Sequence, residues 1–254
     1  MSKPFDATAK DLLEAHPGSW MEYLHLRSRG PVRVIDADLS TVTTEADKVL
    51  RVDDEPQPWL VHIELQAGRD RRFVPRLLRY NVLLDYRHEL PVLSVVVLLR
   101  PEADAPDLTG AIGRVLPDGR GYLRFQYHVV RAWQQPVEAV LQGGLGTLPM
   151  APLADVARED QPNILRRVFE RFRNEASPNE AARLWTATEL LMGLRYPPVV
   201  VDQILQGVGE MDILGIHGIE ESSIYQKILA EGMAKGIAQG TAQEAKRILI
   251  RMGQ

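Results

Sequence analysis

The stretch WLVHIELQAGRDRRFVPRLLRYNVLLDYRHELPVLSVVVLLR, residues 59–100, decides the fold. It begins with a β-like run, Trp59 to Gln66, that stops at a glycine turn. A helical pattern follows from Arg71 to His88, with an apolar face flanked by arginines. The stretch ends with Val92 to Leu99, where Ser94 alone is polar, as in a strand buried on both faces. Strand, helix and buried strand together predict a crossover unit of two parallel strands.

The sequence before this unit predicts helices and then strands. Helical spacing from Phe5 to about Ala15 is followed by a second helical stretch that begins at Trp20. Two short β-like runs come next, from Val32 to about Asp38 and from Asp47 to Val52. With the run that begins at Trp59 they read as a meander of three strands. The order helix, three strands, helix, strand predicts an α/β protein with an αβββαβ core.

The sequence after residue 100 predicts one further strand and then mostly helices. The strand is expected from Leu123 to Trp133, after a proline-glycine turn. A helix is expected from Asn163 to Arg173, and another from Ser177 to about Leu194, opened by a capping box with proline at its first position. Periodicity leaves Val199 to Leu205 open between strand and helix.

The C-terminal segment has an unusual glycine pattern. From Glu220 to Met252 the chain looks helical, yet Gly232, Gly236 and Gly240 recur every four residues. Each glycine costs a helix about 1 kcal/mol relative to alanine. Two interpretations stay open: the glycines admit a partner helix and make a homo-oligomer, or the tail is weakly ordered. We therefore expect an α/β domain over residues 1–145, a helical extension over 146–218 and a glycine-spaced helix over 219–254.

Composition restricts the function classes. The 254 residues include no cysteine, which excludes disulfides and cysteine-ligated zinc and favours a cytoplasmic location. The sequence contains no run of eighteen apolar residues, so no membrane span is expected. The polar N-terminus lacks the apolar central segment of a signal peptide. The net charge of −4 argues mildly against tight nucleic-acid binding. A local basic stripe nevertheless lies between residues 66 and 80, made of Arg69, Arg71, Arg72, Arg76 and Arg79.

The candidate chemistry lies on the run that begins at Trp59. Strand alternation puts His62, Glu64 and Gln66 on one face, and a hairpin can bring Asp47 near Glu64. Two converging carboxylates repel each other unless a cation lies between them, and oxygen ligands suit Mg²⁺ or Mn²⁺. The plainer interpretation is a solvated face of an edge strand. The apolar and helical segments on both sides of the run argue against it.

Further residues are candidates for weaker roles. The helix after Gln66 could hold a phosphodiester backbone, although Tyr80 is equally credible as a partly buried helix residue. His62 could orient a water, but a hydrogen-bonded structural role is the more common one. Glu22 could add a carboxylate or simply lie at the surface. The candidate DNA contacts are Arg72, Arg76, Arg79 and Tyr80.

Several short runs carry a family resemblance. The order of elements, with Asp47 and then Glu64-Leu65-Gln66, resembles the PD-(D/E)xK nuclease superfamily. More closely, ADKVL (46–50), HIELQ (62–66) and RLLRYN (76–81) are similar to the recombination-promoting nucleases of the Rpn type, also described as transposases. The opening FDATAK (5–10) and the glycine-spaced C-terminal helix are similar to bacterial members. The resemblance covers residues 5–135 and extends more loosely over the helical remainder.

The resemblance implies a restriction-endonuclease-like core and a Mg²⁺-dependent DNA endonuclease, with Mn²⁺ as a possible substitute. Asp47 and Glu64 match the metal-binding acids, and Gln66 stands where the superfamily has its catalytic lysine. Glutamine can only hydrogen-bond, so activity would be slower, depend more on the metal, or use a cation from Lys48, Arg79 or Lys10. The alternative is a catalytically weak or inactive DNA-binding or assembly module. A third hypothesis assigns the function to the C-terminal helices.

Overall fold

The computed structural model describes residues 3–28, 30–35 and 48–208. Asp47, the end of the run predicted to reach Asp38, and the glycine-spaced segment 219–254 lie outside the described residues. The helices and strands are, in chain order, α1 (Lys3–Ala15), α2 (Pro17–Tyr23), β1 (Val32–Ile35), β2 (Lys48–Val52), β3 (Trp59–Gln66), α3 (Phe73–His88), β4 (Val92–Leu98), β5 (Ala111–Val115), β6 (Gly121–Gln126), β7 (His128–Arg131), α4 (Val137–Gln142), α5 (Gln161–Glu175), α6 (Pro178–Met192) and α7 (Pro198–Val208).

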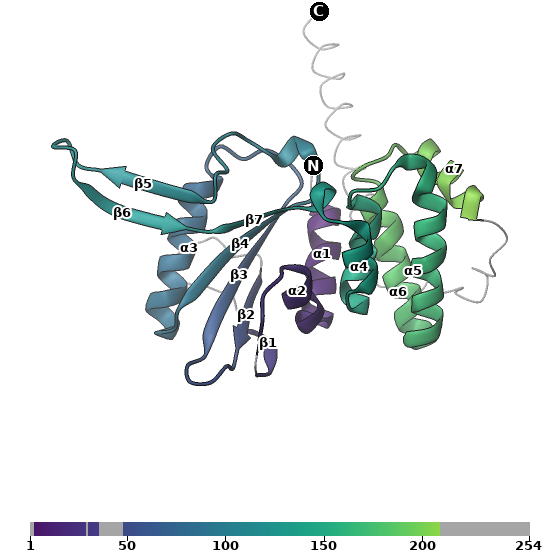
Figure 1. Cartoon of the computed structure of the whole chain (residues 1–254), viewed down its shortest axis with the longest axis horizontal. Helices are drawn as coiled ribbons and strands as arrows, with labels where there is room; N and C mark the ends of the chain where they lie inside the picture. Colours follow the sequence, from purple (N-terminus) through teal and green to yellow (C-terminus); the bar gives the residue numbers. More distant parts are fainter. Residues whose placement is uncertain (1–2, 29, 36–47, 209–254) are drawn as a thin grey trace, which may run out of the picture.

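A mixed five-stranded sheet forms the centre of the α/β part, in the order β1-β2-β3-β4-β7 (Figure 1). The first three strands are antiparallel neighbours, as the predicted meander requires. Strand β4 runs parallel to both β3 and β7. The β3–β4 register sets Glu64 opposite Val96, and the β2–β3 register sets Lys48 opposite Ile63. The α/β class expected from the sequence is therefore correct.

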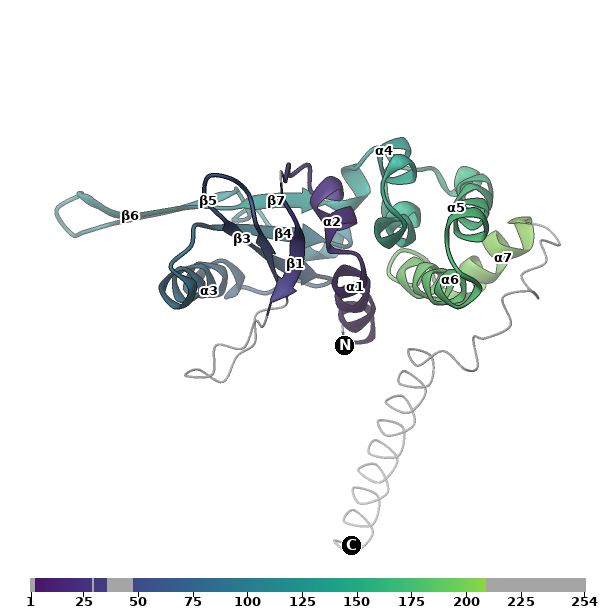
Figure 2. The same cartoon turned by 90° about the horizontal axis from the view of Figure 1, so that it is seen from below.

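The predicted crossover unit is confirmed. The apolar run forms β4, which lies between β3 and β7, and Val95 to Leu98 have no exposed surface. Helix α3 makes the connection and covers one face of the sheet, whereas α1 and α2 cover the other (Figures 1 and 2). Covering both faces buries the run from Ser94 to Leu99, which is why nearly every position in it can be apolar.

Strand alternation divides the apolar residues between two sides of the sheet. On the side of α1 and α2, Val61, Ile63 and Leu65 join a large buried cluster that also contains residues of α5 and α6. On the side of α3, Val96 and Leu98 pack against the start of that helix. The helical region beyond residue 145 therefore shares a core with the sheet. The division at residue 145 stays a prediction.

A buried segment joins the sheet to the helices. Residues Leu145–Leu153 form a 3₁₀ helix that contains Pro149 and Pro152 and is buried from Gly146 onward. Gly146 permits its close approach to the N-terminal helices, because a Cβ there would lie 2.1 Å from the Cβ of His16. Among the described residues, no helix is long and apolar enough to span a membrane.

The two helices predicted between residues 163 and 194 are confirmed with small shifts of boundary. Helices α5 and α6 match the two expected segments, and the predicted cap is present because the Ser177 hydroxyl accepts a hydrogen bond from the Glu180 amide at 3.4 Å. The segment left open between strand and helix is helical, as α7. Pro198 at its start fixes φ in the helical range and removes an amide donor that the first turn does not need.

The prediction of one continuous strand from Leu123 to Trp133 was wrong. The segment divides at Tyr127 into β6 and β7, and only β7 joins the main sheet. Strand β6 pairs instead with β5 in a separate hairpin. The division occurs where the Tyr127 amide donates to the Gly110 carbonyl oxygen at 2.9 Å, which fixes the base of the hairpin.

Trp185 tests whether sheet and helices share one core. Its side chain has no exposed surface, and its ring lies edge-on to Phe169 at 5.6 Å. Trp185→Ala is expected to lower the free energy of unfolding by about 3–5 kcal/mol in urea denaturation, through lost burial and a residual cavity. Val199→Ala, at a side chain that is 68% exposed, should change it by less than about 0.5 kcal/mol. Two separate transitions in the wild type would contradict a shared core.

Candidate active site between β3 and α3

The candidate site is the polar part of β3 that faces α3. Leu60 lies in a small apolar cluster with Tyr80 and Leu84 of α3, so the alternate residues His62 and Glu64 face the same helix. Both are buried, and only 2% of Glu64 is exposed. The polar side chains of β3 therefore do not form the solvated face of an edge strand. They are enclosed between sheet and helix.

Two nitrogen-bearing side chains, His62 and Arg76, contact the Glu64 carboxylate. His62 Nε2 lies 3.3 Å from Glu64 Oε1, and Arg76 Nη2 lies 3.4 Å from Glu64 Oε2. Arg76 also donates through Nη1 to the carboxylate of Asp70, by a shorter hydrogen bond. The guanidinium thus bridges a buried carboxylate on the sheet and a partly buried one in the turn before α3.

A hydrogen-bonded chain fixes the His62 ring. Asn81 Nδ2 lies 3.1 Å from Ser94 Oγ and 2.9 Å from the carbonyl oxygen of Val92. Ser94 Oγ lies 3.3 Å from His62 Nδ1. One tautomer satisfies the whole chain: Asn81 donates to Ser94, Ser94 donates to Nδ1, and Nε2–H donates to Glu64. The ring of Tyr80 closes the site, edge-on to His62 at 5.6 Å.

The environment keeps Glu64 ionised. Burial by itself would raise the pKa of the Glu64 carboxyl, because a charged carboxylate loses its hydration. The hydrogen bond from His62, together with the charge and hydrogen bond of Arg76, outweighs this penalty and holds the pKa of the Glu64 carboxyl below its ordinary value. For Arg76, partial burial lowers the pKa, but the charges of Glu64 and Asp70 raise it overall. A stable ion pair results.

Gln66 and Asp47 are the other two predicted catalytic residues. Gln66 is half-buried at the end of β3, on the same face as Glu64, and its backbone carbonyl accepts a hydrogen bond from Leu99 at 2.8 Å. Within residues 3–28, 30–35 and 48–208, its side-chain amide has no hydrogen-bond partner. The structure does not describe Asp47, so its place beside Glu64 stays a prediction.

One of the four predicted DNA contacts needs correction. Tyr80 is 2% exposed and packs on His62, so its side chain is unavailable to a ligand at the surface. Arg76 pairs with Glu64 and Asp70 within the site, and its contact with DNA stays a prediction. Helical periodicity identifies neighbouring faces, but it does not say which flanking arginine turns toward the sheet. Arg72, the N-cap residue of α3, and Arg79 on that helix are exposed, and their role stays a prediction.

Of the three proposed accessory residues, His62 lies in the site, whereas Glu22 and Lys10 lie on helices of the other layer. Glu22 is exposed on α2, whose buried residues belong to the large cluster on the opposite face of the sheet. Lys10 lies on α1, which packs into the same cluster. Lys48 forms an ion pair with Glu14 of α1. The cation beside Glu64 is therefore Arg76, and of the three proposed donors neither Lys10 nor Lys48 supplies it.

Sequence reasoning missed the residues that support the site from behind. Ser94 and Asn81 orient His62, and Asp70 anchors Arg76. Ser94 carried a usable signal as the one polar residue in the apolar run of β4. Asn81 lies 13 residues earlier, and only the crossover geometry brings it to Ser94. The types Ser94, His62 and Glu64 match a nucleophilic triad, but Ser94 has no exposed surface for a substrate to reach.

The donors at this site fit one ligand of a divalent ion. Both contacts of Glu64 are longer than the roughly 2.7–2.9 Å typical of charge-assisted hydrogen bonds, and a carboxylate can accept about four. Its oxygens are of the type that Mg²⁺ prefers. Within the described ranges, however, no group of three or more acidic or histidine side chains could hold a metal.

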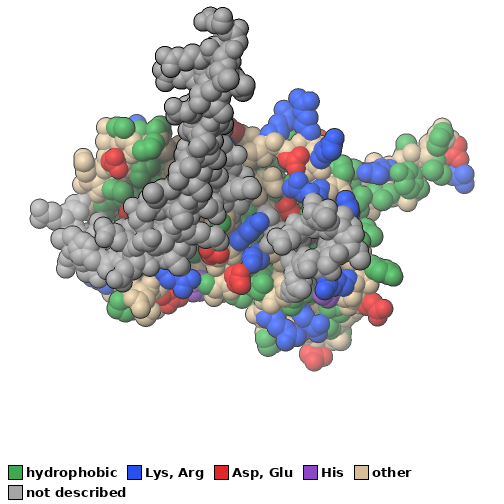
Figure 3. All heavy atoms as spheres, turned by 180° about the vertical axis from the view of Figure 1, so that it is seen from behind, with side chains coloured by type: hydrophobic (Ala, Val, Ile, Leu, Met, Phe, Trp, Pro, Cys, Tyr) green, Lys and Arg blue, Asp and Glu red, His purple; other side chains and the backbone are tan. Residues whose placement is uncertain are grey.

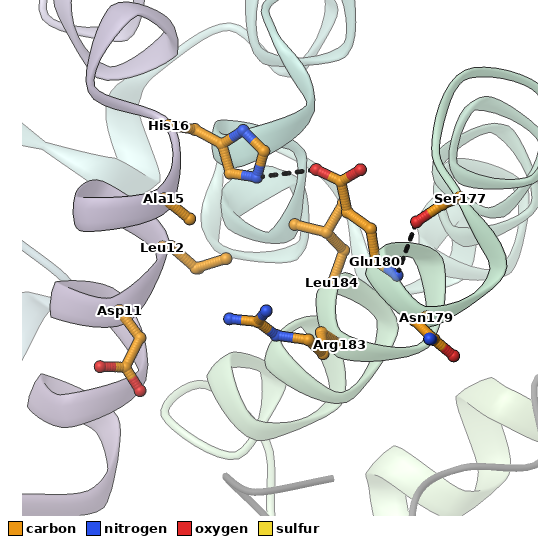
Figure 4. A pocket seen from close by; sticks show the side chains of 9 residues that line it. All are labelled: Asp11, Leu12, Ala15, His16, Ser177, Asn179, Glu180, Arg183 and Leu184. Carbon is orange, nitrogen blue, oxygen red and sulfur yellow. Dashed lines mark hydrogen bonds and ion pairs between the residues drawn. The ribbon is translucent and has the colours of Figure 1, made fainter.

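A cavity of about 240 Å³ lies between α1 and α6, away from Glu64 (Figure 4). His16 Nε2 lies 3.2 Å from Glu180 Oε1 across it. Because α1 covers the face of the sheet opposite α3, this cavity does not open onto the candidate site. It is lined by Asp11, Leu12, Ala15, His16, Ser177, Asn179, Glu180, Arg183 and Leu184.

Comparisons of the chain with protein-family models, with curated proteins and with solved structures gave no significant match. The resemblance to recombination-promoting nucleases consequently depends on the short runs quoted above. The geometry around Glu64 must carry any functional argument.

Acid titration tests the electrostatics of Glu64. A carboxyl whose pKa is lowered on folding stabilises the protein above its unfolded pKa, and this contribution is lost as the pH falls through the folded pKa. Glu64→Gln should lower the free energy of unfolding at pH 7 by about 1–3 kcal/mol, because Arg76 and His62 lose a charged partner. This deficit should shrink below pH 4.5, the ordinary pKa of glutamate.

The measurement is urea denaturation of both proteins between pH 7 and 3, without added metal. Other carboxylates with lowered pKa values, such as Asp104, are present in both proteins and cancel in the difference. A deficit that stays constant with pH would mean that Glu64 is not ionised in the folded protein. A deficit at pH 7 would also mean that the donors around Glu64 outweigh any repulsion from a second carboxylate.

Proposed function

We propose that the chain is a Mg²⁺-dependent DNA endonuclease with a restriction-endonuclease-like core, and that Asp47 and Glu64 bind the metal. The observation that carries the proposal is the state of Glu64. It is buried, its pKa is lowered, and it is held only by two long contacts. An ionised carboxylate with unused acceptor capacity in the middle of a sheet is costly unless it binds something.

The order of elements supports the same proposal. From α2 to β4 the chain runs helix, three antiparallel-paired strands, helix, parallel strand. This order is the one that the resemblance to the PD-(D/E)xK superfamily implies. Glu64 and Gln66 lie near the end of the third of these strands, where that resemblance puts the active site.

Covalent geometry supports Asp47 as the second ligand. Lys48 pairs with Ile63, the residue next to Glu64. The α-carbon of Asp47 is about 3.8 Å from that of Lys48, because the two are joined by one peptide bond. On this proposal Asp47 completes the donor set that Glu64 begins.

Each residue of the site would then have a distinct role. When bound, a Mg²⁺ ion supplies Lewis-acid activation of a water and neutralises charge on a phosphate. Glu64 offers a hard oxygen ligand, kept ionised by its surroundings, and Gln66 offers an amide that can orient a water or a phosphate oxygen. Arg76, tethered by Asp70, offers the positive charge that lysine would otherwise supply. Arg72 and Arg79 lie exposed on the same helix.

A specific observation favours a second candidate, a catalytically weak or inactive DNA-binding module. Both oxygens of Glu64 already face a donor, and Arg76 supplies a full positive charge where a metal would compete. On this hypothesis the Glu64–Arg76 pair is a structural ion pair that sets the position of α3. Gln66 in place of lysine is consistent with it.

Cleavage of supercoiled plasmid in Mg²⁺ or Mn²⁺ separates the two candidates. Glu64→Gln and Asp47→Ala should each lower the rate at least 100-fold, because each removes a metal ligand, and EDTA should abolish cleavage in the wild type. Glu159→Gln is the matched control, since Glu159 is an exposed carboxylate in the helical region. It should cleave at the wild-type rate. Circular dichroism of each variant verifies folding.

Three results decide the matter. Loss of cleavage in both variants, with the control active, supports the nuclease. A wild type that binds DNA and cuts none in either metal favours the inactive module. Equal activity in the wild type and in folded Glu64→Gln contradicts any catalytic role for this carboxylate.

A further inference from the structure

The hairpin β5–β6 projects away from the rest of the protein (Figure 1). Its two strands pair only with each other and make no ladder with the main sheet. An isolated two-stranded ribbon is marginally stable and leaves both of its edges unpaired. A chain that extends such a ribbon into solvent needs a reason for it, and neither the core nor the site around Glu64 requires the part beyond its base.

The base of the ribbon is firmly held beside the start of α3. Phe125 is buried in one cluster with Phe73 and Val74 of that helix, and its ring stacks on Tyr127 at 5.7 Å. Below it, Arg131 makes two hydrogen bonds to Asp104, of 2.7 and 3.0 Å. The ribbon is therefore fixed at the end of α3 that carries Arg76 and the approach to Glu64.

Beyond its base the ribbon exposes large apolar side chains. Val115 is 66% exposed, Tyr122 55% and Leu116 39%, and all three lie close to the turn. They make up half of the large hydrophobic residues that are exposed within the described part of the chain, the others being Val82, Tyr86 and Val199. This concentration on one projecting tip indicates a contact surface.

The same ribbon is basic. It carries three arginines, Arg114, Arg120 and Arg124, against one acid, Asp118, which is already paired with Arg120. Arg114 and Arg124 are exposed, and neither has an ion-pair partner within the described ranges. Figure 3 shows basic and hydrophobic side chains together along the projection.

On one face of the ribbon, strand β5 carries two small residues, Ala111 and Gly113. The register sets Gly113 opposite Arg124 and Ala111 opposite Gln126, and Tyr122 lies on the same face by alternation. A Cβ added to Gly113 would meet nothing within 4 Å, so packing inside the chain does not require glycine there. The small residues leave room for a partner to approach the backbone next to Arg124.

We propose that the β5–β6 hairpin binds in the major groove of duplex DNA, an inference that rests on the proposed DNA-directed function. The groove is about 12 Å wide and admits a two-stranded ribbon, whereas the major groove of A-form RNA is too narrow. Arg114 and Arg124 contact phosphates, and Tyr122 and Leu116 contact the groove floor. A second copy of the chain is a poorer partner, because a symmetric contact would bring unpaired arginines together.

The first test measures salt dependence of binding. A fluorescent 30-base-pair duplex is titrated with the full chain in EDTA, which prevents cleavage, and the dissociation constant is followed by anisotropy from 50 to 300 mM salt. For Arg114→Ala/Arg124→Ala the slope of log K against log salt should fall by about two, with affinity about tenfold or more weaker at 0.1 M. The charge-matched control, Arg173→Ala/Arg183→Ala, removes two exposed arginines of the helical region and should bind like the wild type.

The second test separates the apolar tip from the charges. Leu116→Ser/Tyr122→Ser should weaken binding at least threefold without changing the salt slope, because apolar contacts release no counterions. Duplex RNA of the same length should bind more weakly than DNA and should not distinguish hairpin variants from the wild type. RNA binding that depends on the hairpin overturns the groove assignment.

The remaining outcomes are also decisive. An equal loss of affinity in the Arg173→Ala/Arg183→Ala control overturns the proposal, because any loss of charge would then suffice. If Leu116→Ser/Tyr122→Ser changes the oligomeric state in light scattering and leaves DNA binding intact, the tip binds a second copy and the proposal is wrong. If the hairpin variants bind DNA normally while Glu64→Gln still abolishes cleavage, DNA binding by the hairpin is refuted and the nuclease proposal stands. If DNA binding depends on the hairpin but the wild type cleaves no DNA, the nuclease activity is refuted and DNA binding by the hairpin stands. Absence of DNA binding in the wild type refutes both.

Discussion

The ion pair between Glu64 and Arg76 joins the sheet to the helix that covers it. An ionised carboxylate between two packed layers is stable only when opposite charge and hydrogen bonds offset its desolvation. Each donor that does so is itself held: Arg76 by Asp70, and His62 by a chain that passes through Ser94 to Asn81. The rotation of α3 about its axis is fixed by these contacts, because Arg76 and Asn81 lie on that helix and must both reach the sheet.

Helix α3 consequently presents two unlike surfaces. Its inner side carries Tyr80 and Leu84 as well as the polar contacts to β3 and β4. Its outer side keeps Arg72 and Arg79 in solvent. The protein as a whole has a net charge of −4, so this basic surface is local. Phosphate contacts would then be restricted to α3 and the adjoining hairpin, because attraction over longer distances is weak for an acidic protein.

The sequence predicted the features that depend on the spacing of apolar residues and on the residues that begin or end an element. Alternation in β3, the apolar run of β4 and the capping box of α6 each follow from neighbours in the chain. The break at Tyr127 did not, because the residues on both sides favour strand and only tertiary contact with Gly110 separates them. The role of Arg76 was missed for a related reason. Five arginines lie between residues 69 and 79. The positions of Asp70 and Glu64 in space determine which of them turns inward, and these positions do not follow from the sequence pattern.

Competition between Arg76 and a metal for Glu64 is the physical question that separates the two candidate functions. The stronger contact of Arg76 is with Asp70, and its distance to Glu64 Oε2 is 3.4 Å, beyond an ordinary charged hydrogen bond. About a third of the Arg76 side chain is exposed, against 3% for that of Glu64. The arginine can therefore turn toward solvent while Asp70 retains it, at a cost well below that of moving the carboxylate. On the nuclease hypothesis a phosphate at the site favours this turn, because it offers the guanidinium a bidentate partner. The same side chain would neutralise Glu64 in the free protein and bind the phosphate in the complex.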